Sequence, residues 1–186
     1  MKARSFASIL LLSICIPTLL AQSTSSNSAQ HDAELRNQWV STVRGLAAKG
    51  NADAEDTLGC FYYSGVFGVP QDYARSAVWF HRAAIQGDTG AQGMLGDLYL
   101  YGEGVPQDYS QAYFWLDLAA ANPPRMDSGI PPEAAKLFGK AQKGMAQALI
   151  SDRDEAASHL TRTELFQVQE QVERWVESHK AKSHAQ

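Results

Sequence analysis

The sequence predicts an all-α protein built from repeats, and two observations lead to this prediction. The string Gly-Val-Pro-Gln-Asp-Tyr occurs at Gly68–Tyr73 and returns unchanged at Gly104–Tyr109, 36 residues later. An identical string at such a spacing indicates a repeated structural unit. The apolar residues on either side recur with the helical period of 3.6, and no segment alternates as a strand does. The unit is therefore two helices around a Gly-Pro loop.

The two copies match well beyond this string. The first helix of each unit has an apolar face and stops at Gly65 or Gly102, where a residue without Cβ can take the left-handed cap. Val-Pro then prevents helix, and Asp72 or Asp108 is placed to N-cap the second helix. The corresponding residues are Ala54, Leu58, Gly59, Tyr62, Trp79, Ala83 and Ala84 in the first copy, and Ala91, Leu95, Gly96, Tyr99, Trp115, Ala119 and Ala120 in the second.

This pattern resembles the Sel-one-like repeat, a relative of the tetratricopeptide repeat. The resemblance is carried by the residues just named together with Gly68-Val69-Pro70 and Asp72-Tyr73, and it covers residues 52–122. It implies an α-solenoid of stacked antiparallel helix pairs, with repeats at 51–87 and 88–122. It also implies an adaptor or scaffold for protein–protein interaction, because such repeats usually present a binding surface to partners.

Residues 1–23 have the pattern of a signal peptide. They combine a basic start, Lys2 and Arg4, with an apolar run and small residues that suit cleavage. The run is too short to span a bilayer, so we favour export with removal over a membrane anchor. A lipoprotein site at Cys15 is disfavoured because Ile14 precedes it, where such sites carry a small residue. We expect the mature protein in the periplasm of a Gram-negative bacterium or in the medium, without a stable membrane anchor.

The charge of the mature chain argues against nucleic acid as a partner. Lys2 and Arg4 leave with residues 1–23, so 14 of the 16 basic residues stand against 20 acidic ones, a net charge of −6. Proteins that bind nucleic acid carry basic patches instead. The Ser-, Asn- and Gln-rich stretch that follows leads us to predict a disordered tether over residues 24–32.

Helices are expected to close both ends of the stack. Residues 33–50 carry an apolar stripe at helical spacing, which predicts a helix that covers the N-terminal end. Residues 123–180 are predicted to form a C-terminal helical segment, in which Thr161 with Glu164 has the pattern of a capping box. The polar tail over 181–186 is expected to fray.

The sequence contains no familiar catalytic or metal-binding motif. No two of the 5 histidines have the zincin spacing, and a Gly-x-Ser-x-Gly elbow, a Gly-rich phosphate loop and a Ser-x-x-Lys motif are all absent. We therefore predict no enzymatic activity, no cofactor and no metal, and a serine β-lactamase mechanism is not supported. An envelope enzyme acting on peptidoglycan or β-lactam is the alternative, and a secreted host-interaction factor is a second one.

The face lined by the first helix of each pair is the expected binding surface, because helical repeats usually present that face to partners. The candidate partner-binding residues depart from the shared pattern there: Glu55, Asp56, Tyr63, Gln92, Asp97 and Leu100. Acidic groups beside Tyr63 and Leu100 predict a shallow, exposed groove for a protein or peptide segment with positive charge.

Cys60 is the only cysteine left once residues 1–23 are removed. A disulfide needs two cysteines, so Cys60 is predicted to be an inert, half-buried thiol. A reducing agent should therefore leave the melting temperature of the purified mature protein unchanged, as measured by circular dichroism. A large loss of stability on reduction would instead reveal an intermolecular bridge or a retained Cys15.

Overall fold

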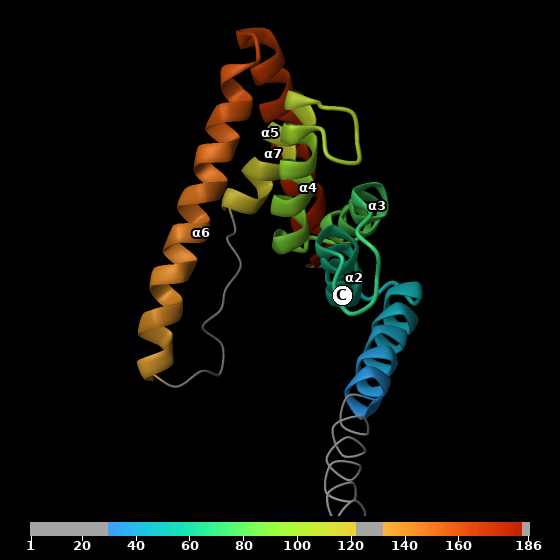
Figure 1. Cartoon of the computed structure of the whole chain (residues 1–186). Helices are drawn as coiled ribbons and strands as arrows, with labels where there is room; N and C mark the ends of the chain where they lie inside the picture. The colour runs from blue at the N-terminus through green and yellow to red at the C-terminus, as the bar shows by residue number, and fades with distance from the viewer. Residues whose placement is uncertain (1–29, 122–131, 184–186) are drawn as a thin grey trace, which may run out of the picture. The chain divides into compact units, whose positions relative to one another are not determined.

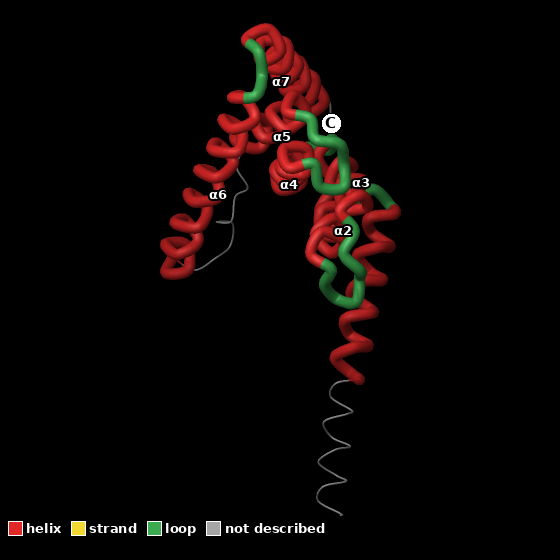
Figure 2. The backbone as a smooth tube through the Cα atoms, turned by 45° about the horizontal axis from the view of Figure 1, so that its top comes forward, coloured by secondary structure: helices red, strands yellow, loops and turns green. Residues whose placement is uncertain are grey.

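The computed structural model describes residues 30–121 and 132–183, and these ranges contain helices and no strand (Figure 2). The chain divides into two units, Met1–Thr42 and Val43–Gln186. The prediction of an all-α protein is confirmed. The predicted signal peptide, and the loop expected before Pro132, lie outside the described residues.

A helix covers residues 30–48. The predicted tether over 24–32 is therefore wrong for residues 30–32, which are helical, while the rest of that stretch is not described. The physical reason is that neither glycine nor proline occurs between residues 30 and 44, so no residue there terminates the helix. Leu35 and Trp39 of this helix are each close to half exposed.

The last turns of this helix belong to the second unit and pack there. Val43 and Ala47 are buried, and the Arg82 guanidinium donates a hydrogen bond to the Ala47 carbonyl at 3.4 Å. These contacts agree with a helix that closes the first repeat. The extent of the predicted N-terminal cap over residues 33–50 stays a prediction.

Four helices form the repeated part of the second unit (Figure 1). They are α2 (Ala52–Ser64), α3 (Tyr73–Ala84), α4 (Thr89–Tyr101) and α5 (Tyr109–Ala121). α2 packs on α3 and α4 packs on α5, while α3 and α4 join the two pairs. The α-solenoid of helix pairs implied by the sequence resemblance is confirmed.

The helix caps predicted from the sequence are present. α2 and α4 end at Gly65 and Gly102, whose φ angles of 67° and 70° lie in the left-handed region. Each glycine amide donates to the carbonyl four residues earlier, which satisfies one of the free acceptors at the helix end. Asp72 and Asp108 accept from the amides three residues later at 2.9 and 3.0 Å and thereby cap α3 and α5.

The two tryptophans at equivalent repeat positions are buried to different extents. Trp115 is 4% exposed and belongs to the main core. Trp79 is only half-buried, and the Arg82 guanidinium lies over its ring at 4.7 Å. The second repeat therefore buries its tryptophan, whereas in the first repeat a cation lies over the ring.

Two further helices, α6 (Pro132–Ser158) and α7 (Arg162–Ser183), complete the second unit, and both pack on α5. The predicted capping box begins α7: the Thr161 amide donates to Glu164 at 2.8 Å, and the Glu164 amide donates back to the Thr161 hydroxyl at 3.3 Å. The helix continues to Ser183, so the predicted tail over 181–186 begins too early.

Packing explains why α7 extends so far. His179 stacks on Trp175 with ring centroids 3.6 Å apart, and its Nε2 lies 3.1 Å from the Ile85 carbonyl oxygen. Trp175 and Val176 also pack against the main core. The end of α7 is therefore held against the end of α3 by tertiary contacts that a polar local sequence does not reveal.

Leu100 is buried, and the prediction that it lines an exposed groove is wrong. It is 2% exposed and lies in a second core cluster. The other buried members of this cluster are Ala112, Tyr113, Leu116, Ala156 and Val168. Because Ala156 and Val168 belong to α6 and α7, the C-terminal helices help to bury a position that the repeat alone would leave more open.

Replacing Leu100 with alanine should lower the free energy of unfolding by about 2–5 kcal/mol, because the truncation leaves a cavity in a packed core. Tyr101 next to it is 55% exposed. Tyr101→Ala is therefore the matched control and should change stability by about 0.5 kcal/mol or less. Urea unfolding followed by circular dichroism measures both variants, and equal effects would contradict the burial of Leu100.

Candidate functional site

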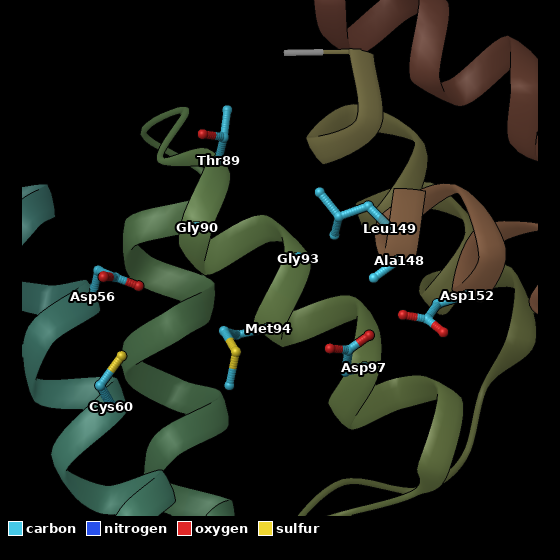
Figure 3. A pocket seen from close by; sticks show the side chains of 10 residues that line it. All are labelled: Asp56, Cys60, Thr89, Gly90, Gly93, Met94, Asp97, Ala148, Leu149 and Asp152. Atoms are coloured by element: carbon cyan, nitrogen blue, oxygen red, sulfur yellow. The ribbon is translucent and has the colours of Figure 1, made fainter. Parts of the chain in front are cut away.

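A pocket of about 280 Å³ lies between α2, α4 and α6 (Figure 3). Asp56 and Cys60 reach it from α2, and α6 supplies a further wall. The pocket therefore lies on the face lined by the first helix of each repeat, where the sequence predicted a binding surface. Its third wall comes from outside the repeats.

The lining of the pocket is mainly apolar. Met94 of α4 lies between the two sides, with Cys60 from α2 and Leu149 from α6 beside it (Figure 3). α6 approaches α4 closely because Gly93 has no side chain: a Cβ there would lie 2.9 Å from Leu149 Cδ2. The bare backbone of α4 thus helps to shape the pocket.

Three carboxyl groups surround this apolar lining, one from each helix: Asp56 of α2, Asp97 of α4 and Asp152 of α6. Asp97 and Asp152 lie next to each other on facing helices (Figure 3). One oxygen each of Asp56 and Asp97, the Oδ1 atom, is shielded from water and has no hydrogen-bond partner among the described residues. Buried polar atoms in proteins are nearly always paired, so two unpaired oxygens in one pocket need an explanation.

The environment raises the pKa of these carboxyl groups. Burial raises the pKa of Asp97 to about 7, and the charges of Asp152 and Glu103 add to the shift. Burial likewise raises the pKa of Asp56 to about 6, with smaller contributions from Asp88 and Asp53.

Asp152 follows the same direction as the other two acids. Its pKa is raised by partial burial and by the charge of Glu155. All three groups share one physical cause, removal from water among negative neighbours. Asp56 and Asp97 therefore gain or lose a proton close to neutral pH.

The neighbouring cations are engaged elsewhere. Arg153 follows Asp152 directly, but it pairs with Asp117 at 3.3 Å and with Asp154 at 2.7 Å. Among the ion pairs of the described residues, none involves Asp56, Asp97 or Asp152. The positive charge that would complete the pocket is therefore not supplied by the described part of this chain.

Glu55 and Gln92, predicted to lie on the exposed face, are buried at 1% and 2% exposure. Glu55 pairs with Arg82 at 2.6 Å and accepts from Gln86 at 2.6 Å, while Gln92 donates to the Ala84 carbonyl at 3.2 Å. Both are structural residues whose polar atoms have partners, which corrects the prediction. Glu55 and Gln92 occupy equivalent positions in the two repeats, and both are polar. This shared polarity was the feature of the sequence that pointed to a structural role.

Tyr63 is half-buried and packs edge-on against Tyr73, with ring centroids 5.2 Å apart. It does not line the pocket. Of the six predicted site residues, the structure brings Asp56 and Asp97 together there, and their role in partner binding stays a prediction. Sequence reasoning missed Leu149 and Asp152, because nothing in the repeat pattern connects α6 to this face.

Cys60 is a free thiol whose pKa is raised to about 11, first by burial and then by the charges of Asp56 and Asp88. The nucleophilic form of cysteine is the thiolate, which this environment disfavours. Within the described ranges, no group of three or more His, Cys, Asp or Glu side chains is arranged to hold a metal ion. Nor does any helix there have both the length and the apolar character needed to cross a membrane.

Comparison with known proteins relates the repeats to one family. The family model described as the Sel1 repeat matches residues 52–88 and 89–123. Each of these bounds lies one residue after the corresponding bound of the repeats predicted at 51–87 and 88–122.

Two solved structures and one curated protein are similar to this chain. The structure of a protective antigen present in uropathogenic Escherichia coli strains, which displays an SLR fold, matches with a TM-score of 0.58 and 29% identity over 89% of this chain and 33% of its own. A Sel1 repeat protein from Oxalobacter formigenes matches with a TM-score of 0.43 and 33% identity over 53% of this chain and 26% of its own.

The curated protein is the ERAD-associated E3 ubiquitin-protein ligase component HRD3A of Arabidopsis thaliana. It is 40% identical over 58 residues, which make up 31% of this chain and 9% of that protein. This chain thus spans a third or less of the length of each of these three proteins.

Replacing Asp97 with asparagine should stabilise the protein above neutral pH and have little effect in acid. The unfolded chain releases this proton near pH 3.9, and the folded protein releases it near pH 7. Between these values the folded state binds more protons, so its stability falls as pH rises through the window. Asparagine avoids this loss, and the gain at about pH 8 should be about 4 kcal/mol.

Urea unfolding at about pH 4 and about pH 8 brackets this window and measures the difference. Glu170→Gln, which removes one negative charge from an exposed position of α7, is the control. A gain that is the same at both pH values would contradict the proposed cause.

Proposed function

The protein is built on two Sel1 repeats, and on that basis we propose that it is an exported interaction module that holds a basic segment of a partner protein between α2, α4 and α6. Sel1 repeats generally serve as scaffolds for protein–protein interaction. The observation that carries the proposal is the pocket, in which unpaired carboxyl groups surround an apolar lining. A positively charged segment would supply the hydrogen-bond donors and the cation that these carboxyl groups lack.

The energetic state of the pocket supports this proposal. A buried polar atom without a partner costs about 1–3 kcal/mol, so Asp56 and Asp97 lower the stability of the unliganded protein. A ligand that donates hydrogen bonds to these oxygens recovers that free energy on binding. Buried polar groups that lower stability and contribute nothing to the fold are found mainly at functional sites.

The proposed location outside the cytoplasm rests on the composition of residues 1–23, a basic start followed by an apolar run. The similar Escherichia coli protein is a protective antigen, which agrees with a protein that antibodies can reach. A secreted factor that binds a host protein would use the same pocket and would differ only in its compartment. Fractionation of the producing cells into periplasm and medium separates these two cases.

The alternative of an envelope enzyme also has one observation in its favour. A carboxyl group with raised pKa, here Asp97, beside a second one, Asp152, is also the arrangement found in glycoside hydrolases. However, the pocket volume of about 280 Å³ lies just below the range of about 300–1,000 Å³ typical of small-molecule sites. Turnover of muropeptides or of a β-lactam by the purified protein would favour this alternative over the binding module.

Selection of peptides from a random library on the immobilised mature protein tests the proposed function. Peptides retained by the wild-type protein should be enriched in lysine and arginine, because the pocket carries negative charge and no cation. Ala148 is exposed and lines the pocket, so Ala148→Trp should fill the space and abolish retention. Gln147, its exposed neighbour, does not line the pocket, and Gln147→Trp should leave retention intact.

Both variants introduce the same side chain on the same helix, so a general effect of tryptophan would appear in both. Retention of the same peptides by Ala148→Trp would place the binding face elsewhere. Enrichment of uncharged or acidic peptides would contradict the role given to Asp56, Asp97 and Asp152.

A further inference from the structure

We infer that the pocket recognises one arginine side chain of the partner, with its guanidinium held between Asp97 of α4 and Asp152 of α6 and its methylene stem on Met94 and Leu149. This inference rests on the proposed function and names the ligand of the same pocket.

The two carboxyl groups belong to different helices and lie next to each other across the pocket (Figure 3). A guanidinium carries five N–H donors in one plane and can therefore donate to a carboxylate on each of two sides. The Oδ1 atom of Asp97 is buried without a partner, so at least one acceptor is already in place and dehydrated. A single planar cation satisfies this arrangement better than two separate ligands.

The lining fits the rest of an arginine side chain. Met94 and Leu149 provide an apolar surface beside the carboxyl groups, and Gly93 leaves the helix backbone bare at the same place. Long cationic side chains bury their methylene stems on apolar surface while the charged head reaches a polar group. The pocket therefore offers an apolar surface for the methylene stem and carboxyl groups for the charged head.

The surroundings are acidic on every side. The titratable groups that act on Asp97 are Asp152 of α6 and Glu103 of the loop after α4, and Glu155 acts in turn on Asp152. The α2 side adds Asp56, whose charged neighbours are Asp53 and Asp88. Arg153, the cation nearest in sequence, is paired with Asp117 and Asp154.

A bound cation relieves the mutual repulsion of these groups and favours their ionised form. Because burial and neighbouring acids raise the pKa of Asp97 to about 7, binding near neutral pH should release a proton. The affinity for arginine should accordingly rise between about pH 5 and about pH 8. Lysine should bind less well, since its ammonium is more strongly hydrated and cannot serve two carboxylates with one planar group.

Three capped tripeptides test the inference on the full mature chain: Gly-Arg-Gly, Gly-Lys-Gly and Gly-citrulline-Gly. Citrulline has nearly the shape of arginine and no charge, so it separates charge from fit. The amide signals of Gly90 and Gly93, which line the pocket, report binding by nuclear magnetic resonance. The arginine peptide should shift both signals, the lysine peptide should bind more weakly, and the citrulline peptide should leave them in place.

The double variant Asp97→Asn, Asp152→Asn should weaken binding of the arginine peptide roughly 10- to 100-fold, the usual effect of losing charged hydrogen-bond partners. The control Glu170→Gln lies on the exposed side of α7 and should bind as the wild-type protein does. Equal binding of arginine and citrulline, or unchanged binding by the double variant, would overturn the inference. Tighter binding of lysine than of arginine would overturn the role of the guanidinium.

The result can be separated from a failure of the proposed function itself. If Ala148→Trp abolishes retention of library peptides while the arginine tripeptide shifts neither glycine signal up to its solubility limit, the inference falls and the binding module stands. If Ala148→Trp has no effect on retention, the pocket is not the binding site and both proposals fall.

Discussion

Close contact between the two helices of each repeat is the constraint on which the rest of the structure depends. A Cβ at Gly59 would lie 2.6 Å from the Phe80 ring, and a Cβ at Gly96 would lie 2.6 Å from Leu116 Cγ. Both distances are too short for real atoms, so only glycine permits the observed packing. This packing sets the position of each first helix on the second helix of its own repeat.

The polar residues of α2 and α4 fall into two groups that differ in whether they have partners. Glu55 and Gln92 are deeply buried, and each has hydrogen-bond partners within the chain. Asp56 and Asp97 are less buried overall, yet each has one shielded oxygen without a partner. A buried polar atom with a hydrogen-bond partner indicates a structural residue. A buried polar atom without a partner at a pocket indicates a residue that binds a ligand.

Small differences between the two repeats shape the lining of the pocket. The position of Asp56 in the first repeat is taken by Gly93 in the second, and the position of Cys60 is taken by Asp97. Gly93 admits Leu149 of α6, which has no counterpart on the first repeat. An acidic pocket therefore forms where the two repeats meet a helix from outside them.

The sequence by itself determined the helices, their ends and the repeat, because these depend on local chemistry. The left-handed glycine cap at Gly65 and the N-cap at Asp72 act within a few residues, and both are present as predicted. Burial was decided by the tertiary structure alone: Glu55 is buried by pairing with an arginine of α3, and Leu100 by packing that includes α6 and α7. The proximity of Asp97 to Asp152 was hidden for the same reason, since the two residues are brought together by helix packing and by no pattern along the chain.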